Sequence, residues 1–421
     1  MDFCRQQVSL SEPLPYSRME ERMKYGVLMH KTTMNLGDDI QAYASAQFLP
    51  HIDYMVEREN IDSFRSEGNE PVGVIMSAWW MWQKWNWPPA ECIVPKLVSM
   101  HMNNYTIYRK ASPIQDEWLQ DIGGEFFRAN GPIGCRDQTT MDFFNERGFD
   151  CYFSGCITLT LPKQKKTPDA GKYVCLVDLK PELEAAAREW LKDSGLEIRV
   201  LTHHCDYRKS NATREERFAA VEDILTQYQN ARFVVTRRLH VSLPCLAMET
   251  PVLSIVNMND TGNTTRWAPY YNWVHNISDK DFIAGDIPFD YHNPPENKKE
   301  YLPTREALSS SIRQFIEETK DCELPIGQVK KVSYTEEEAR RWQNELMHWT
   351  LEKWLHQNRG LLEERNKFKK KAATLEKRLK KENGGVLPEE VAKIQKLEKQ
   401  LEEVTLKDWA KACIKRHRSG K

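Results

Sequence analysis

The amino-acid sequence predicts an α/β protein with two doubly wound, Rossmann-like domains and a C-terminal helical extension. The chain has 421 residues, which is long enough for two core domains and an appendage. Short apolar runs alternate with helical patterns up to about residue 325, as is typical of parallel sheets covered by helices. Beyond about residue 335 the pattern is helical alone.

The first domain is expected over residues 25–165, after a polar lead-in at residues 1–24. Its first strand is the apolar run YGVLM (25–29), and a polar loop then leads into a helix from about Asp38 to Phe48. Further strands are expected at 72–78, 97–102, 151–153 and in a run that ends at Cys135, with helices at 114–128 and 139–147.

The second domain is expected over residues 170–325, because the Pro- and Lys-rich segment 161–172 has the composition of a linker. The pattern of strands and helices restarts after it. Strands are expected at 173–179, 197–202, 232–236 and 251–256, and helices at 181–194, 214–228, 239–248 and 304–318.

The segment 335–421 is predicted to be a helical arm. Apolar residues such as Leu351, Leu361 and Leu375 follow alternating spacings of three and four, and the segment Asn383-Gly384-Gly385 interrupts this seam. We interpret the arm as an antiparallel helical hairpin or a coiled coil that packs on its own core or self-associates. It carries a net charge of +7, and binding of its basic surface to a membrane or polyanion is the alternative.

Charge and cysteine content favour a soluble cytoplasmic protein. The net charge of −1 argues against non-specific nucleic-acid binding by the whole molecule. The ten cysteines form no CxxC pair, which indicates free thiols in a reducing compartment and no metal cluster. No apolar run is long enough to cross a membrane. The sequence calls for no cofactor.

The segment FVVTRRLHVSL (233–243) is the strongest candidate for a functional site. A buried strand is expected to end at Thr236, so Arg238 and His240 fall where the next helix begins. Ligands of open α/β sheets bind at such strand ends, where helix N-termini favour anions. An arginine there can hold a carboxylate or phosphate, and a histidine can transfer a proton. The alternative is two surface arginines and a capping histidine.

Arg136 is expected to lie in the same position in the first domain. The segment GPIGCRDQTT (131–140) is interpreted as a strand ending at Cys135, followed by a helix capped near Thr139 or Thr140. The alternative role of Arg136 is a salt bridge with Asp137 or a contact with the helix cap. Arginines at strand ends in both domains favour a substrate with two anionic groups.

Three further segments are candidates for acceptor binding or base catalysis. Gly37 and Asp38 lie in the first loop, where a carboxylate would repel an anion, so contact with a neutral sugar is favoured. Trp79 and Trp80 belong to the cluster WWMWQKWNW, whose rings could stack on a sugar, although most of them are expected to be core. His101 follows a predicted strand and is a weaker candidate than His240.

Four of these segments resemble the polysaccharide pyruvyl transferase family. They are Gly37-Asp-Asp-Ile-Gln, Gly134-Cys-Arg-Asp, Ser154-Gly-Cys-Ile-Thr-Leu-Thr-Leu and Arg238-Leu-His with Pro251-Val, which occur in the family's order. The resemblance covers about residues 25–300. The chain departs from the family's commoner Gly-Asn-x-Gly-Asp loop in having Asn35-Leu-Gly-Asp.

The resemblance implies a two-domain fold similar to GT-B glycosyltransferases and transfer of pyruvate from phosphoenolpyruvate to the hydroxyls of a glycan, which forms a ketal. By motif position, Arg136, Arg238 and Leu239 would bind the donor between the domains. His240 would be the general acid. Asp38 and His101 are the candidates for the base, and Gly37, Trp79 and Trp80 for acceptor contacts.

Two rival functions remain open at this point. A glycosyltransferase that uses a nucleotide sugar would share the architecture, although no acidic ribose clamp is evident. A non-catalytic scaffold of a glycan pathway would need neither arginine, so the presence of Arg136 and Arg238 argues against it. The sequence does not specify the acceptor sugar, the linkage or the pathway.

Overall fold

The computed structural model describes residues 23–83, 85–102, 115–207, 212–256, 266–321 and 332–382. The chain divides into two compact units, Met1–Asn103 with Trp118–Arg340, and Asn104–Glu117 with Arg341–Lys421. The first unit holds both of the large parallel sheets, so the fold is mixed α/β as predicted. Most of the lead-in at 1–24 and the part of the helical arm beyond Glu382 lie outside the described residues.

The first sheet has four parallel strands in the order β2-β1-β3-β5. Helix α1 (Leu36–Ala46) connects β1 to β2. Because all strands are parallel, their carboxyl ends meet at one edge, where the loop before α1 lies. The strands are β1 (Lys24–Met29), β2 (Tyr54–Glu57), β3 (Val72–Ile75) and β5 (Ile93–Lys96).

Two pairs of very short parallel strands extend this half of the unit. Strand β4 (Trp79–Trp80) pairs with β6 (His101–Met102), and β7 (Ile133–Cys135) pairs with β8 (Cys151–Phe153). A bridge between Met100 and Cys135 links the two pairs, so His101 and Arg136 emerge from neighbouring strands. Instead of one helix over 114–128, the structure has α2 (Gln115–Trp118) and α3 (Asp121–Asn130), followed by α4 (Gln138–Asn145).

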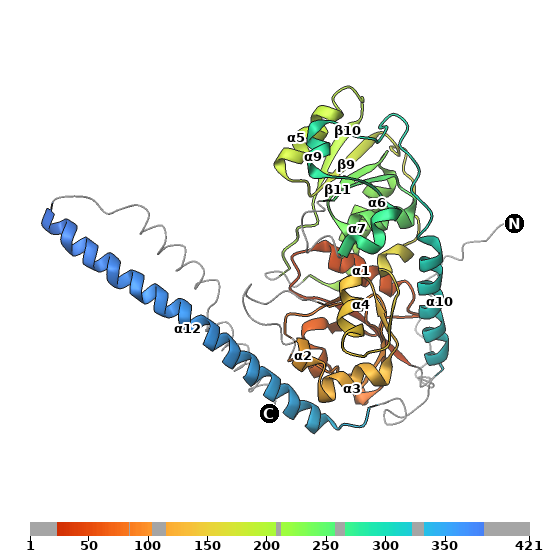
Figure 1. Ribbon diagram of the computed structural model, residues 1–421. Coiled ribbons are helices and arrows are strands. Elements are labelled where there is room, and N and C mark those ends of the chain that lie inside the picture. The colour runs from red at the N-terminus through yellow and green to blue at the C-terminus, as the bar shows by residue number, and fades with distance from the viewer. Residues whose placement is uncertain are drawn as a thin grey trace. The chain divides into compact units, whose positions relative to one another are not determined.

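The second sheet has five parallel strands in the order β10-β9-β11-β12-β13. Side chains of β9 alternate between two apolar clusters, one shared with α6 and α7 and the other with α5. Helices therefore cover both faces of this sheet, as Figure 1 shows. The strands are β9 (Tyr173–Val177), β10 (Glu197–Leu201), β11 (Val234–Thr236), β12 (Val252–Ile255) and β13 (His275–Ile277), and the helices are α5 (Pro181–Trp190), α6 (Arg214–Asn230), α7 (Leu239–Met248) and α9 (Asp279–Ala284).

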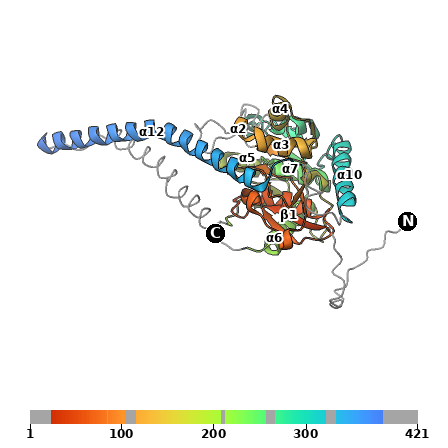
Figure 2. The same ribbon diagram turned by 90° about the horizontal axis from the view of Figure 1, so that it is seen from below.

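A continuous apolar core joins the two sheets. Ile40 and Ala44 of α1 share one cluster with Val221 of α6 and Val241 of α7. Helix α10 (Leu302–Thr319) begins at the level of α1 and α7 in Figure 1 and lies at one side of this unit in Figure 2. Its first part contributes Leu308 and Ile312 to this cluster, and its end packs against β1. The first turns of α1 and α7 are thereby held against each other.

The second unit is described mainly by the later part of a single long helix. Helix α12 spans Glu336–Glu382, 47 residues, and begins with a capping arrangement in which Thr335 Oγ1 accepts from the backbone N–H of Glu338 at 3.2 Å. A helical arm is thus present, while the second helix of the expected hairpin falls beyond the described residues. None of the helices described is long and apolar enough to cross a membrane.

Candidate active site

The first turn of α1 is the point at which the predicted functional segments meet. The loop after β1 ends at Asn35, whose side-chain Oδ1 accepts from the N–H of Gly37 at 3.2 Å and caps the helix. The helix therefore begins at Leu36 and not near Asp38. Asp38 lies in the first turn instead and accepts a 2.5 Å hydrogen bond from Thr33 Oγ1. Two further residues of this helix contact other parts of the site. Gly37 lies against His240 of α7, and Gln41, one turn later, accepts a hydrogen bond from Arg136.

Arg136 emerges from the end of β7 and is almost completely buried, with 1% of its surface exposed. One of its terminal nitrogens donates to Oε1 of Gln41, and its carbonyl accepts from the hydroxyl of Tyr270. Its Nε is buried without a hydrogen-bond partner and lies 3.8 Å from Oδ2 of Asp137. Because a buried guanidinium is costly unless its N–H groups are paired, this nitrogen is suited to bind an anion.

His101 and Asp137 form a buried dyad beside Arg136. His101 Nδ1 lies 2.5 Å from Asp137 Oδ2, while Oδ1 of Asp137 accepts from the N–H and the hydroxyl of Thr140, each at 2.9 Å. Asp137 therefore caps α4, in place of the expected Thr139 or Thr140. Despite its burial, interaction with His101 lowers the pKa of Asp137 to about 2.

The protonation of His101 follows from its burial. Burial lowers its pKa to about 4, against the opposing effect of Asp137, so the imidazole is neutral near pH 7. A neutral ring beside a carboxylate holds its proton on Nδ1, which leaves a lone pair on Nε2. That Nε2 is buried and has no hydrogen-bond partner. The arrangement is the one expected of a base whose orientation is fixed by an aspartate.

His240 lies in the first turn of α7, directly against α1. A Cβ on Gly37 would lie 3.0 Å from His240 Nδ1, so the two helices approach closely only because residue 37 is glycine. Nε2 of His240 is buried and has no hydrogen-bond partner. Burial, together with the charges of Arg136 and Arg266, holds the pKa of His240 well below its usual range. His240 is therefore neutral in the ligand-free protein. The preceding Leu239 is buried, and its side chain belongs to the core.

Arg238 is positioned as predicted at the end of β11, but it is not a free cation. Its Nε lies 2.6 Å from Oδ2 of Asp178, and one terminal nitrogen donates to Asn35 Oδ1 at 3.3 Å. Asp178 follows β9 and is itself held by Thr202 Oγ1 at 2.7 Å. Just over a third of the Arg238 side chain is exposed (37%), so it can present its remaining nitrogen to a ligand.

The two predicted acceptor tryptophans differ in their environment. Trp80 is fully buried: its Nε1 donates to the Met76 carbonyl at 3.2 Å and its ring packs edge-on against Trp87. The prediction that Trp80 contacts a sugar is therefore wrong, because its ring belongs to the aromatic core. Trp79 is partly exposed and lines a pocket with Asp38. Its role in acceptor binding stays a prediction.

Sequence reasoning missed the partners that complete the site. Asp178 and Arg266 were not singled out. Gln41 was named only as the last residue of a family-like segment, and the only role considered for Asp137 was as a partner of Arg136. Only the position of Gln41 could have been inferred from the sequence, because it lies one helical turn after Gly37 and on the same face of the predicted helix. Among the described residues, no group of three or more His, Cys, Asp or Glu side chains is arranged to hold a metal ion.

Together, the fold and the buried cluster of Arg136, His101 and His240 define an α/β protein with a candidate site at the junction of two parallel sheets. The family model for polysaccharide pyruvyl transferase matches residues 35–259, which is more than half of the chain and includes all of these residues. The chain belongs to this family, and membership implies a transferase.

Two further comparisons add little to this assignment. No curated protein matches the sequence. Among solved structures, the chain is similar to the crystal structure of an uncharacterised protein from Klebsiella pneumoniae, at 12% identity and a TM-score of 0.34, over 61% of this chain and 92% of the other.

Proposed function

We propose that this protein transfers pyruvate from phosphoenolpyruvate to two hydroxyls of a glycan, forming a cyclic ketal and inorganic phosphate. One observation carries the proposal: Arg136 Nε, His101 Nε2 and His240 Nε2 are all buried without hydrogen-bond partners within one electrostatically coupled cluster. Buried polar atoms in native proteins are normally paired, so three unpaired atoms together favour a ligand that supplies their partners. A small anionic donor meets this requirement.

Both arginines would hold the donor, though in different ways. Arg136 is buried and would bind one anionic group through its unpaired Nε. Arg238 would bind the other with the nitrogen that Asp178 and Asn35 leave open. Leu239 would contribute its backbone N–H, because the first N–H groups of α7 have no acceptor within the helix and its side chain is in the core.

The histidines would manage the protons. His101 accepts the proton of the first hydroxyl while that oxygen bonds to C2 of the donor, and His240 protonates C3. The bond from C2 to the phosphate oxygen then breaks, and the second hydroxyl oxygen bonds to C2. Of the two hydroxyl protons released, one is balanced by the proton gained at the new methyl group and the other leaves with phosphate.

The neutral state of His240 in the ligand-free protein is compatible with its role as an acid. Burial and the charge of Arg136 keep its pKa low. A donor bound to Arg136 would offset that positive charge and add negative charge nearby, which favours the imidazolium. In this proposal the donor itself raises the pKa of His240, so the acid forms only when there is substrate to protonate.

The proposal extends to the arrangement of the two halves, the cellular location and the helical arm. The two parallel sheets, joined through α1 and α7, support a GT-B-like arrangement in which the donor binds between the halves. The described cysteines are free thiols, which supports a cytoplasmic location. The long α12 supports self-association of the helical arm through a coiled coil.

The test is donor-dependent release of phosphate. The purified protein is incubated with phosphoenolpyruvate and a broad panel of glycosides, and phosphate and ketal are followed by ³¹P and ¹H NMR. We expect Arg238→Lys to raise the KM for phosphoenolpyruvate at least about tenfold, because lysine cannot form the fork. Arg237→Lys is the matched control, since Arg237 lies beside Asp279 at 3.7 Å, outside the cluster.

Two outcomes would contradict the proposal. If no glycoside is pyruvylated while a nucleotide sugar is turned over, the protein is a glycosyltransferase. If Arg238→Lys leaves donor affinity unchanged, Arg238 is not part of the anion site.

A further inference from the structure

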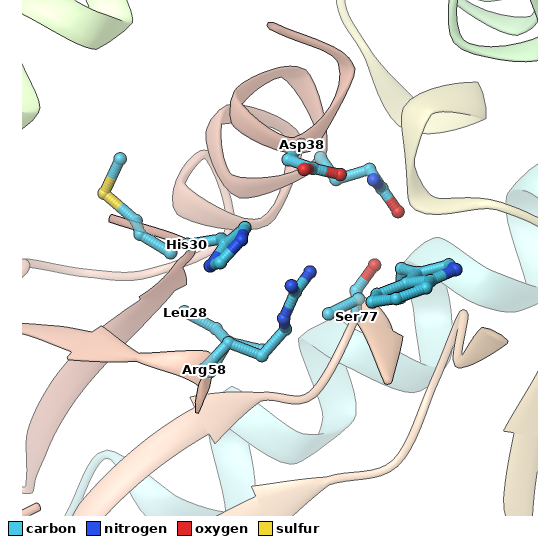
Figure 3. Close-up of a pocket in the computed structure, with 9 residues that line it drawn as sticks. Leu28, His30, Asp38, Arg58 and Ser77 are labelled. Carbon is cyan, nitrogen blue, oxygen red and sulfur yellow. The ribbon is translucent and has the colours of Figure 1, made fainter. Parts of the chain in front are cut away.

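The first turn of α1 faces the strand ends of the first sheet on one side. Figure 3 shows Asp38 of this turn across from His30, Arg58 and Ser77, which follow β1, β2 and β3. The space between these side chains is about 10 Å³, roughly the room that one water molecule needs. A donor held by Arg238 therefore depends on the other side of this turn, where the strands of the second sheet end.

Asp178 joins the strand ends of the second sheet. It directly follows β9, which lies between β10 and β11. On the β10 side, its Oδ1 accepts from Thr202 Oγ1 at 2.7 Å and its Oδ2 accepts from the backbone N–H of His203 at 2.9 Å. On the β11 side, Oδ2 lies 2.6 Å from Nε of Arg238. One carboxylate thus connects three neighbouring strands at the edge where ligands of parallel sheets bind.

The backbone of Asp178 is held in an unusual conformation. Its φ of 49° lies in the left-handed region, which residues other than glycine seldom adopt. Such a conformation costs free energy and persists only where the surrounding contacts enforce it. The N–H of Asp178 donates to the Leu201 carbonyl at 3.1 Å, so the turn that brings the carboxylate to Arg238 is itself fixed.

The second support of Arg238 is tied to the first. Asn35 Oδ1 accepts from a terminal nitrogen of Arg238 at 3.3 Å. The neighbouring Leu36 donates its N–H to the carbonyl of His203 at 2.8 Å, and the N–H of His203 donates to Asp178. These residues therefore form a closed ring of contacts. The ring constrains Arg238 from two directions, although 37% of its side chain is exposed.

A carboxylate beside the donor site has two opposing effects on anion binding. Although burial raises it, hydrogen bonds from Thr202 and His203 and the charge of Arg238 hold the pKa of Asp178 below its usual value, so Asp178 is ionised near pH 7. Its charge repels an anion. Its contact with Arg238 favours binding, because a side chain that is already held loses less rotamer freedom when a ligand arrives. Water screens the repulsion at the partly exposed Arg238, so we expect the ordering to be the larger effect.

We infer that Asp178 is a positioning residue of the donor site, which orients Arg238 so that the open nitrogen of this arginine can meet the anionic donor. Asp178 would not touch the donor itself. The inference rests on the proposed function for the identity of the donor, whereas the orientation of Arg238 can be measured without any ligand. The alternative is a carboxylate that only stabilises the strand ends.

The first experiment needs no donor. Arginine labelled with ¹⁵N at Nε gives an Nε–H signal for Arg238 in the full-length protein, assigned by its loss in Arg238→Lys. We expect this hydrogen to exchange slowly with water and to exchange at least about tenfold faster in Asp178→Gly, which lacks the acceptor. Glycine adopts a positive φ without strain, so this variant keeps the turn. Exchange that is equally fast in both proteins would overturn the inference.

The second experiment measures phosphate release at varied concentrations of phosphoenolpyruvate. We expect Asp178→Gly to raise the KM for phosphoenolpyruvate about tenfold, since the donor must then order Arg238 itself. Asp178→Asn should recover part of this loss, because asparagine also tolerates the left-handed conformation and its amide oxygen can accept from Nε. A KM that falls in both variants would mean that Asp178 acts by repulsion alone, and would overturn the inference.

A double variant separates positioning from a structural role. In an Arg238→Gln background there is no guanidinium to orient, so Asp178→Gly should change the KM by less than about twofold. The same rise in both backgrounds would show that Asp178 acts on the fold and not on Arg238. If Asp178→Gly does not fold, Asp178→Asn carries each measurement, with the same direction and a smaller size.

Glu249→Gln is the matched control. Glu249 also has a left-handed backbone, with a φ of 60°, and its Oε2 lies 2.6 Å from Lys163 Nζ. It caps the C-terminal end of α7, whereas Arg238 precedes the first turn of this helix. Loss of this ion pair should leave both the exchange at Arg238 and the KM unchanged.

The two proposals fail separately. A slowly exchanging Arg238 Nε–H without phosphate release from phosphoenolpyruvate would remove the proposed function and keep Asp178 as the residue that orients Arg238. Phosphate release with an exchange rate and a KM that Asp178→Gly leaves unchanged would keep the function and remove Asp178 from the donor site.

Discussion

At the scale of single residues, Gly37 has a role that follows from packing. A Cβ at this position would lie 3.0 Å from Nδ1 and 3.2 Å from Cβ of His240, closer than nearly all real contacts. The sequence suggested an acceptor contact for Gly37 because it lies in a loop near Asp38. The structure shows that it also sets the distance between the first turns of α1 and α7. His240 can be displaced through this position without being mutated.

Gly37→Ala is expected to separate activity from stability. Alanine is favoured over glycine in a helix by up to about 1 kcal/mol, and this gain opposes the strain of moving His240. The free energy of unfolding should therefore fall by no more than that strain. That movement should lower kcat about tenfold or more, because proton transfer requires close geometry. Steady-state phosphate release and thermal unfolding measure the two effects.

The double variant tests the cause. In a His240→Ala background the imidazole ring is absent and only the Cβ contact at 3.2 Å remains, so Gly37→Ala should lower kcat little further. Additive losses in the double variant would mean that Gly37 acts by another route.

At the scale of elements, burial decides which segments the sequence could predict. Helix α7 was predicted with its observed bounds, Leu239–Met248, because most of its residues are apolar and every residue is buried. Strands β2 (YMVE) and β5 (IVPK) were missed because only one residue in each is fully buried, so neither has an apolar run. They exist through pairing with β1 and β3, which is a tertiary effect.

The same limit applies to the site. The positions of Arg136 and Arg238 at strand ends could be inferred, since a buried run followed by a polar helix start is a local pattern. Their partners could not, because Gln41 is 95 positions from Arg136 in the chain and Asp178 follows a different strand from Arg238. Long-range pairing carries no local signal. The orientation of His101 by Asp137 depends on such a contact as well.

Asn35→Asp tests the N-terminus of α1 as an element. Aspartate is as good a cap as asparagine, so the helix and the melting temperature should be kept. The new carboxylate would face Arg238, which now contacts Asn35 Oδ1 at 3.3 Å, and would compete with the donor for its charge. We expect the KM for phosphoenolpyruvate to rise about tenfold, corresponding to roughly 1.4 kcal/mol of donor binding.

Asn35→Ser is the matched control for this prediction, since serine keeps the cap and adds no charge. An equal rise in KM for both variants would show that the amide itself, and not the charge, is what Arg238 needs.

At the scale of the whole molecule, the junction between the sheets carries several buried ionisable groups. Burial lowers the pKa of both His101 and His203 to about 4 and holds that of His240 well below its usual range. Burial also raises the pKa of Asp39 to about 6, although Arg217 donates to Asp39 Oδ1 at 3.1 Å. These groups make the stability of the folded chain depend on pH.

We expect stability to fall as the pH drops from about 6.5 towards 4. In this range the three histidines are protonated in the unfolded chain but not in the folded one, so acid favours unfolding. Asp39 acts in the opposite direction, because the folded state binds its proton first as the pH falls through about 6. With three groups against one, the unfolded state binds about two protons more near pH 5, which corresponds to a loss of about 3 kcal/mol per pH unit. Towards pH 4 the low pKa of Asp137 adds to this loss.

Denaturant unfolding at a series of pH values measures this slope, and His203→Gln tests its origin. His203 is buried against Tyr228, with Nε2 2.8 Å from the phenol oxygen, so glutamine can keep a polar contact without a titrating ring. The slope should then fall by about one proton. His204→Gln serves as the control because the side chain of His204 is exposed. A slope unchanged by His203→Gln, or a stability that rises as the pH falls from about 6.5, would show that the buried histidines do not govern the acid response of the fold.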